Sequence, residues 1–116
     1  MAGRTTGRLR VVRGPDRDLS ADVCDQMIVG REDSAGFRLS DRDVSRQHFR
    51  IVMRQEGLEL EDLGSSNGTK VNGRHVSFRP LVPGDRIEAG NTELVYELPG
   101  YRKPLPLPLL VGLGLV

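Results

Sequence analysis

Three short stretches of the sequence carry residue types that could together hold an anion beside an extended peptide. They are Gly30-Arg31, Ser45-Arg46-Gln47-His48, and Ser65-Ser66-Asn67-Gly68-Thr69, the last followed by Asn72-Gly73. A guanidinium donates two hydrogen bonds to one phosphate, and small hydroxyl and amide side chains add further donors. Asn-Gly pairs favour tight turns, where backbone amides can point outward. The set indicates a recognition site and not a catalytic one.

Taken singly, each of these residues has an ordinary structural explanation. An arginine such as Arg31 is usually a solvated surface residue, and Ser45 or Ser66 is usually a turn or cap residue. The combination of the three stretches favours a functional reading. His48 is the exception. It lies on the strand face opposite Phe49 and Ile51, and we predict for it a buried, hydrogen-bonded scaffold role rather than contact with a ligand.

Short strands separated by turns must position these residues. Alternation of apolar and polar residues predicts a strand from Arg8 and a hairpin over 47–62. Further strands are expected at 26–29, 37–39, 69–71, 75–76, 85–89 and 92–98. No segment of ten or more residues has the apolar period of a helix. The sequence therefore predicts an all-β fold, a two-sheet β-sandwich of short antiparallel strands with little or no helix and a core of Leu, Val and Ile.

Composition limits the class of function. A chain of 116 residues and 12.8 kDa has room for one compact domain. Its 17 basic and 16 acidic residues give a net charge of +1, so nothing draws the whole molecule to nucleic acid, and an anion site must be local. Cys24 is the only cysteine, which excludes an internal disulfide and favours a cytoplasmic location.

Enzymatic and cofactor chemistry find little support. Ser45 and His48 could suggest a hydrolase, but neighbours at this spacing do not by themselves bring a nucleophile and an oriented base together. The two histidines and the cysteine lack the paired spacing of a zinc site, and no phosphate-loop or dinucleotide motif is present. We expect no catalysis, no metal and no cofactor.

The three stretches, in this order and spacing, resemble the signature of the forkhead-associated family, and the resemblance runs from about Arg8 to Leu98. It implies a bacterial phosphothreonine-binding module with an FHA-like sandwich. The residues implied to bind the phosphopeptide are Arg31 and Ser45 at the phosphate, Ser66 near the phosphothreonine, Asn67 at the peptide backbone and Arg46 close to the peptide. The residues implied to support the site are Gly30, His48, Gly68, Thr69, Asn72 and Gly73.

This resemblance implies a monomeric module that docks onto proteins phosphorylated by a Ser/Thr protein kinase, in signalling and without turnover. It also implies a preference for phosphothreonine over phosphoserine. The sequence has no basic stripe or aromatic ladder, so we expect no role for nucleic acid. One alternative is an interaction or scaffold domain that uses the sandwich without phosphate. A dephosphorylated peptide separates the two hypotheses, because it would bind equally well to a scaffold domain.

The ends of the chain raise two further questions. We predict a flexible N-terminus over 1–6, the folded domain over 7–99 and a Pro/Leu-rich tail over 100–116. The uncharged part of the tail is shorter than the roughly 20 residues that span a bilayer, but basic residues before an apolar run resemble the approach to a transmembrane segment. The chain could then be the cytoplasmic receiver domain of a longer membrane-anchored protein. Thr5 or Thr6, if phosphorylated, could be captured by the domain's own pocket, as the resemblance to short bacterial relatives implies.

Overall fold

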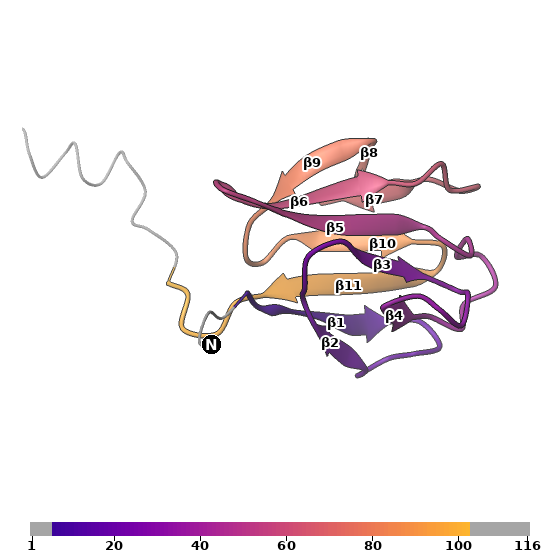
Figure 1. Ribbon diagram of the computed structural model, residues 1–116. Coiled ribbons are helices and arrows are strands. Elements are labelled where there is room, and N and C mark those ends of the chain that lie inside the picture. The colour runs from indigo at the N-terminus through magenta and orange to yellow at the C-terminus, as the bar shows by residue number, and fades with distance from the viewer. Residues whose placement is uncertain (1–5, 103–116) are drawn as a thin grey trace, which may run out of the picture.

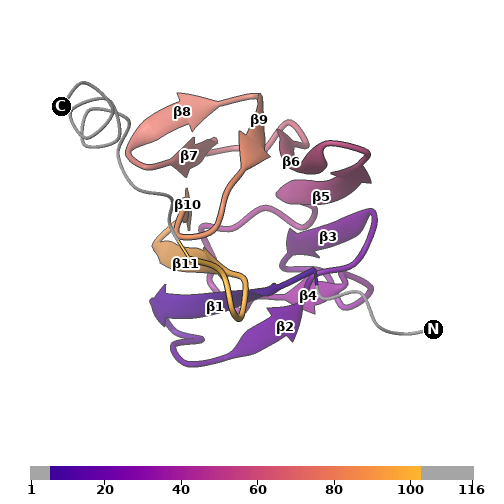
Figure 2. The same ribbon diagram turned by 90° about the vertical axis from the view of Figure 1, so that its left-hand side faces the viewer.

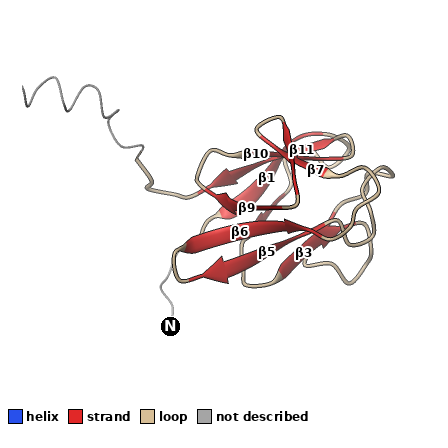
Figure 3. Ribbon diagram, turned by 90° about the horizontal axis from the view of Figure 1, so that it is seen from above, coloured by secondary structure: helices blue, strands red, loops and turns tan. Residues whose placement is uncertain are grey.

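The computed structural model describes residues 6–102, which form two packed sheets (Figures 1 and 2). The first sheet contains, in spatial order, β2 (Ser20–Asp22), β1 (Arg8–Arg13), β11 (Thr92–Glu97), β10 (Arg86–Ala89), β7 (Thr69–Val71) and β8 (Arg74–Val76). The second contains β4 (Phe37–Arg38), β3 (Met27–Gly30), β5 (Phe49–Arg54), β6 (Gly57–Asp62) and β9 (Phe78–Leu81). The described residues contain no helix (Figure 3), which confirms the predicted all-β sandwich.

Alternation along the strands explains why the two sheets pack together. In β1, Leu9 and Val11 are fully buried, while the flanking Arg8 and Arg13 are exposed. The same period recurs in β11, where the residues facing inward are buried and their neighbours are half-buried. The buried side chains are mainly Leu, Val and Ile, with Phe49 as the largest fully buried one. Burial of this apolar surface is the main stabilising contribution to the sandwich.

The strand pattern differs from the sequence-based expectation at three places. The short edge strands β2 and β9 were not predicted, because neither has a clear apolar alternation and β9 contains Pro80. Proline is tolerated there because β9 lies at the edge of its sheet. The pair β3–β4 runs parallel, although all strands were expected to be antiparallel.

The connections β3–β4, β4–β5, β6–β7 and β10–β11 gather at one end of the sandwich, at the right in Figures 1 and 3. Hydrogen bonds join these loops to one another, as described below. The two ends of the described chain lie at the opposite end of the sandwich, where Thr6 accepts a hydrogen bond from Tyr96 over 2.9 Å.

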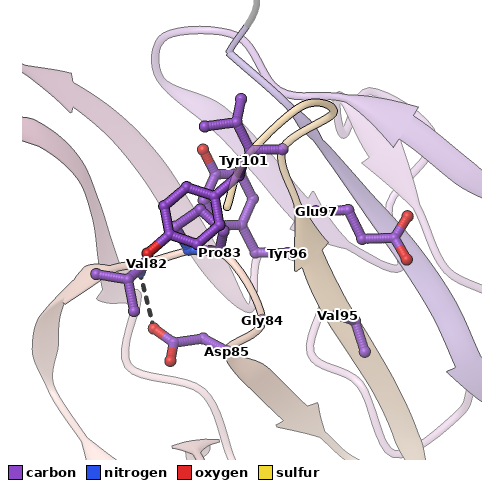
Figure 4. A pocket seen from close by; sticks show the side chains of 9 residues that line it. Val82, Pro83, Gly84, Asp85, Val95, Tyr96, Glu97 and Tyr101 are labelled. Carbon is purple, nitrogen blue, oxygen red and sulfur yellow. Dashed lines mark hydrogen bonds between the residues drawn. The ribbon is translucent and has the colours of Figure 1, made fainter. Parts of the chain in front are cut away.

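A groove of about 580 Å³ lies at this opposite end (Figure 4). It is formed by the β9–β10 turn, the end of β11 and Tyr101. The carboxylate of Asp85, which lines it, already accepts hydrogen bonds from the backbone amide of Val82 and the side chain of Asn72. None of the residues predicted to bind a phosphopeptide lines this groove.

Residues 6–102 contain no helix long and apolar enough to cross a membrane. The apolar part of the tail, which resembles the approach to a transmembrane segment, lies outside the described residues.

Candidate functional site

The β4–β5 connection is the segment to which the other loops of the site attach. Its backbone carbonyls at residues 43 to 46 each accept a hydrogen bond from a neighbouring loop. Asn67 Nδ2 donates to the carbonyl of Asp43 over 2.9 Å, and Arg31 Nε donates to that of Val44 over 2.9 Å. The backbone amides of Arg31 and Glu32 donate to the carbonyls of Ser45 and Arg46 over 3.0 and 3.2 Å. These bonds fix the β3–β4 and β6–β7 loops relative to one another.

Gly30 is required by the close approach of two backbones. A Cβ atom at this position would lie 2.1 Å from the carbonyl oxygen of Arg46 and 3.0 Å from that of Ser45. Any side chain would push the β4–β5 connection away from the end of β3. The glycine thus allows Arg31 to begin its loop directly against the segment that carries Ser45.

Arg31 is exposed, and its side chain is oriented by a neutral acceptor. Its Nε donates to the carbonyl of Val44 over 2.9 Å, and this acceptor is neutral. Among residues 6–102, no ion pair engages Arg31, and no hydrogen bond uses its terminal nitrogens. Arg38, in contrast, pairs with Asp33 at 3.0 Å. The guanidinium of Arg31 is held in place while its fork remains free to bind an anion.

Ser45 joins the β4–β5 and β6–β7 loops through its hydroxyl. The backbone amide of Ser66 donates to Ser45 Oγ over 2.9 Å. Because the oxygen acts as an acceptor in this bond, the hydroxyl hydrogen of Ser45 remains available to a ligand. Ser66, Asn67 and Arg46 are exposed around this bond, and the described residues provide no ion pair for Arg46.

His48 lies beneath the site and is fully buried. Its Nδ1 accepts a hydrogen bond from the backbone amide of Ser45 over 2.9 Å, so Nδ1 carries no proton. The proton of the neutral ring is therefore on Nε2, which donates to the carbonyl of Gly68 over 2.8 Å. The ring connects the two loops that carry Ser45 and Asn67.

Asp62, which sequence reasoning missed, organises the β6–β7 loop. Its carboxylate accepts hydrogen bonds from the amides of Gly64 and Ser65 and from the hydroxyls of Ser65 and Thr69. The buried Thr69 begins β7, so these bonds fix both ends of the loop. An aspartate followed two residues later by glycine in a turn region was a local signal for such an arrangement.

Asp41 and Asp43 were also missed, together with their contact to the β10–β11 turn. Asp41 accepts hydrogen bonds from the amides of Asp43 and Asn91 and from the hydroxyl of Thr92. Asp43 accepts one from Asn91 Nδ2 over 2.5 Å. No local pattern in the sequence could have revealed the contacts to Asn91 and Thr92, because these partners lie about 50 residues away.

The pKa values of Asp41 and Asp62 lie below the ordinary value for aspartate. Burial is the largest single influence on each and raises the pKa. The hydrogen bonds that each carboxylate accepts together outweigh burial and lower the pKa. The stabilisation from each group is therefore complete above the unfolded pKa of about 4 and is lost as the pH falls through the lower folded value.

We therefore expect the melting temperature to fall as the pH is lowered from about 6 to about 3. An Asp62→Asn variant cannot titrate at this position, so it should start from a lower melting temperature and lose less on acidification. Thermal unfolding followed by circular dichroism at a series of pH values measures both slopes. Parallel slopes for the two proteins would contradict this account of Asp62.

The structure places the predicted site residues in two groups. Those of the first three stretches lie together at the loop end described above. Asn72 and Gly73 do not join them: both have positive φ values, +52° and +85°, and they form the turn between β7 and β8. Asn72 hydrogen-bonds Asp85 and the backbone of Arg86 at the start of β10. These two residues stabilise the β7–β8 hairpin.

Thr6 is engaged away from the site. Its hydroxyl donates to the carbonyl of Val23 over 2.6 Å, and its own carbonyl accepts from Tyr96. Thr5, the other residue considered for self-capture, lies outside the described residues. Within residues 6–102, no group of three or more His, Cys, Asp or Glu side chains could hold a metal ion.

Two proteins of known name are similar to this chain in sequence. FhaA of Mycobacterium tuberculosis, an FHA domain-containing protein, is 41% identical over 71 residues, which cover 61% of this chain and 14% of FhaA. The glycogen accumulation regulator GarA of the same organism is 36% identical over 90 residues, which cover 76% of this chain and 55% of GarA. The chain thus spans about half or less of the length of these two relatives.

A solved structure and a family model extend the match. The structure, reported as a structural and functional analysis of phosphothreonine-dependent FHA domain interactions, superposes with a TM-score of 0.71 at 34% identity, covering 84% of this chain and 97% of that chain. The family model described as "FHA domain" matches residues 27–90, which include the β3–β4, β4–β5 and β6–β7 loops and the first residue of the β10–β11 turn. The chain therefore belongs to the forkhead-associated (FHA) domain family.

Proposed function

We propose that this chain is a phosphothreonine-dependent docking module that binds proteins phosphorylated by a Ser/Thr protein kinase. The residues that bind the phosphopeptide are Arg31, Ser45, Arg46, Ser66 and Asn67. The observation that carries the proposal is the placement of Arg31 and Ser45. Arg31 leaves its guanidinium fork free while its Nε is fixed on Val44, and Ser45 keeps a hydroxyl donor beside it.

The donors of the site are oriented before any ligand binds. Arg31 is held by a neutral carbonyl, Ser45 by the amide of Ser66, and Asn67 by the carbonyl of Asp43. Preorganisation lowers the entropy that must be lost on binding. A hydrogen bond to a charged group contributes about 1.5 to 3 kcal/mol, so two or three such bonds to one phosphate are sufficient for specific binding.

Asn67 suits the peptide rather than the phosphate. One hydrogen of its Nδ2 binds Asp43, which leaves the second hydrogen and the carbonyl oxygen of the side chain exposed. An amide with one donor and one acceptor matches the donor and acceptor of an extended peptide backbone.

The module acts by docking and catalyses no reaction. The site contains no nucleophile with an oriented base, because both nitrogens of His48 are used in hydrogen bonds to the backbone. GarA, a relative, is named as a regulator. We propose that the domain is a monomer. We place it in the cytoplasm, where kinases and their phosphorylated substrates meet.

The test is a titration of labelled phosphothreonine peptides with the whole chain, with unphosphorylated and phosphoserine peptides of the same sequence as controls. We expect binding only to phosphorylated peptides, with phosphothreonine preferred about fourfold or more, since a buried methyl group contributes about 0.8 kcal/mol. Equal binding of the unphosphorylated peptide would instead support a scaffold domain that uses no phosphate. Equal binding of phosphoserine would remove the threonine preference alone.

A further inference from the structure

The β10–β11 turn, Gly90-Asn91, packs against the residue that holds Asn67. The side-chain amide of Asn91 donates to the carboxylate of Asp43 over 2.5 Å. The backbone carbonyl of Asp43 in turn accepts from Asn67 Nδ2 over 2.9 Å. One residue, Asp43, thus connects Asn91 to the side chain proposed to bind the peptide backbone.

Gly90 provides a second, independent contact on the same residue. A Cβ atom at Gly90 would lie 2.8 Å from the carbonyl carbon of Asp43 and 2.9 Å from its oxygen. Its φ of +58° also favours glycine. The turn therefore lies directly against the carbonyl that accepts the hydrogen bond from Asn67.

Asp43 is restrained on its other side as well. Its amide donates to Asp41 over 2.9 Å, and the carboxylate of Asp41 is bound to the amide of Asn91 and the hydroxyl of Thr92. The next carbonyl along the chain, that of Val44, holds Arg31 Nε. Two adjacent carbonyls thus set the spacing between the guanidinium and the Asn67 amide.

We propose that Asn91 is a positioning residue for phosphopeptide recognition. By binding the Asp43 carboxylate, it fixes the Asp43 carbonyl and with it the Asn67 amide at the spacing from Arg31 that a phosphopeptide requires. This inference rests on the function proposed above. It assigns a role to the β10–β11 turn through Asp43, without contact between Asn91 and the ligand.

The first test measures the affinity of four variants for one phosphothreonine peptide. Three of them change one partner of the Asn91–Asp43 hydrogen bond, and the fourth exchanges the two partners. Asn91→Ala should weaken binding about three- to tenfold, less than the loss of a direct hydrogen bond to the phosphate, because Asn91 acts on the ligand only through Asp43 and Asn67. Asn91→Asp should weaken it at least as much, because two carboxylates then face each other. Asp43→Asn keeps an acceptor oxygen for Asn91 but loses its charge, so it should weaken binding less than Asn91→Ala does. Combining Asn91→Asp with Asp43→Asn reverses the direction of the bond and should restore affinity.

A double-mutant cycle separates positioning from a general loss of stability. In an Asn67→Ala background, Asn91→Ala should cause no further loss of affinity, because the side chain that it positions is gone. In an Arg46→Ala background, the two losses should multiply. Equal losses from Asn91→Ala in the Asn67→Ala background and in the parent would overturn the proposal.

Nuclear magnetic resonance of the free protein decides the inference independently of binding. The side-chain amide resonances of Asn67 should shift in Asn91→Ala and return in the reversed pair. Unchanged resonances would overturn the positioning role even if phosphopeptides bind. If the parent chain binds no phosphopeptide, the proposed function fails, whereas normal binding by both the parent and Asn91→Ala would reject this inference alone.

Discussion

Replacing Arg31 by alanine is expected to weaken binding of a phosphothreonine peptide about ten- to a hundredfold. The loss corresponds to one charge-assisted hydrogen-bonded contact of about 1.5 to 3 kcal/mol, at a factor of ten for each 1.4 kcal/mol. The guanidinium is exposed, and its only hydrogen bond among residues 6–102 runs from Nε to the carbonyl of Val44, so its removal should leave the fold intact. Isothermal titration calorimetry of the variant and the parent measures the difference in affinity.

Two matched variants sharpen the interpretation of Arg31→Ala. Arg31→Lys keeps the charge but cannot form both the bond to Val44 and a two-pronged contact with phosphate, so it should recover only part of the affinity. Arg74→Ala removes the same charge from an exposed residue on β8 and should change affinity less than about twofold. Similar losses from Arg74→Ala and Arg31→Ala would reduce the role of Arg31 to a general electrostatic attraction.

The sequence was most informative where a pattern is local. Alternation predicted the β5–β6 hairpin, whose register pairs Phe49 with Asp62 and Arg54 with Gly57. It failed at β2 and β9, because an edge strand three or four residues long has too few positions to show a period. The parallel pairing of β3 with β4 depends on how the chain crosses over, which alternation does not encode.

The site shows the same division between local and long-range information. The Asn67-Gly68 and Asn72-Gly73 pairs are similar as sequence signals, yet they lie at opposite ends of the short strand β7. Asp41, Asp43 and Asn91 carry no motif, and only the folded chain brings them together. The peptide-binding roles of Arg31 and Asn67 remain predictions that the binding experiments test.

Replacing His48 by alanine is expected to destabilise the domain by about 2 to 4 kcal/mol. The ring is fully buried, so its loss leaves a cavity. It also leaves the amide of Ser45 and the carbonyl of Gly68 without their hydrogen-bond partner beneath the site. Urea denaturation gives the free energy of unfolding, and the melting temperature should fall by roughly 4 to 8 °C for each kcal/mol.

The same variant should lose phosphopeptide affinity under conditions where it is still folded, because the ring holds the loops that carry Ser45 and Asn67 together. His75→Ala is the matched control, since His75 is an exposed histidine on β8 and its loss should change stability by no more than about 0.5 kcal/mol. If His48→Ala lowers stability but a folded sample binds phosphopeptide as tightly as the parent, the ring supports the core alone. Loss of both properties in His48→Ala, with neither lost in His75→Ala, would indicate that the ring also sets the distance between Ser45 and Asn67.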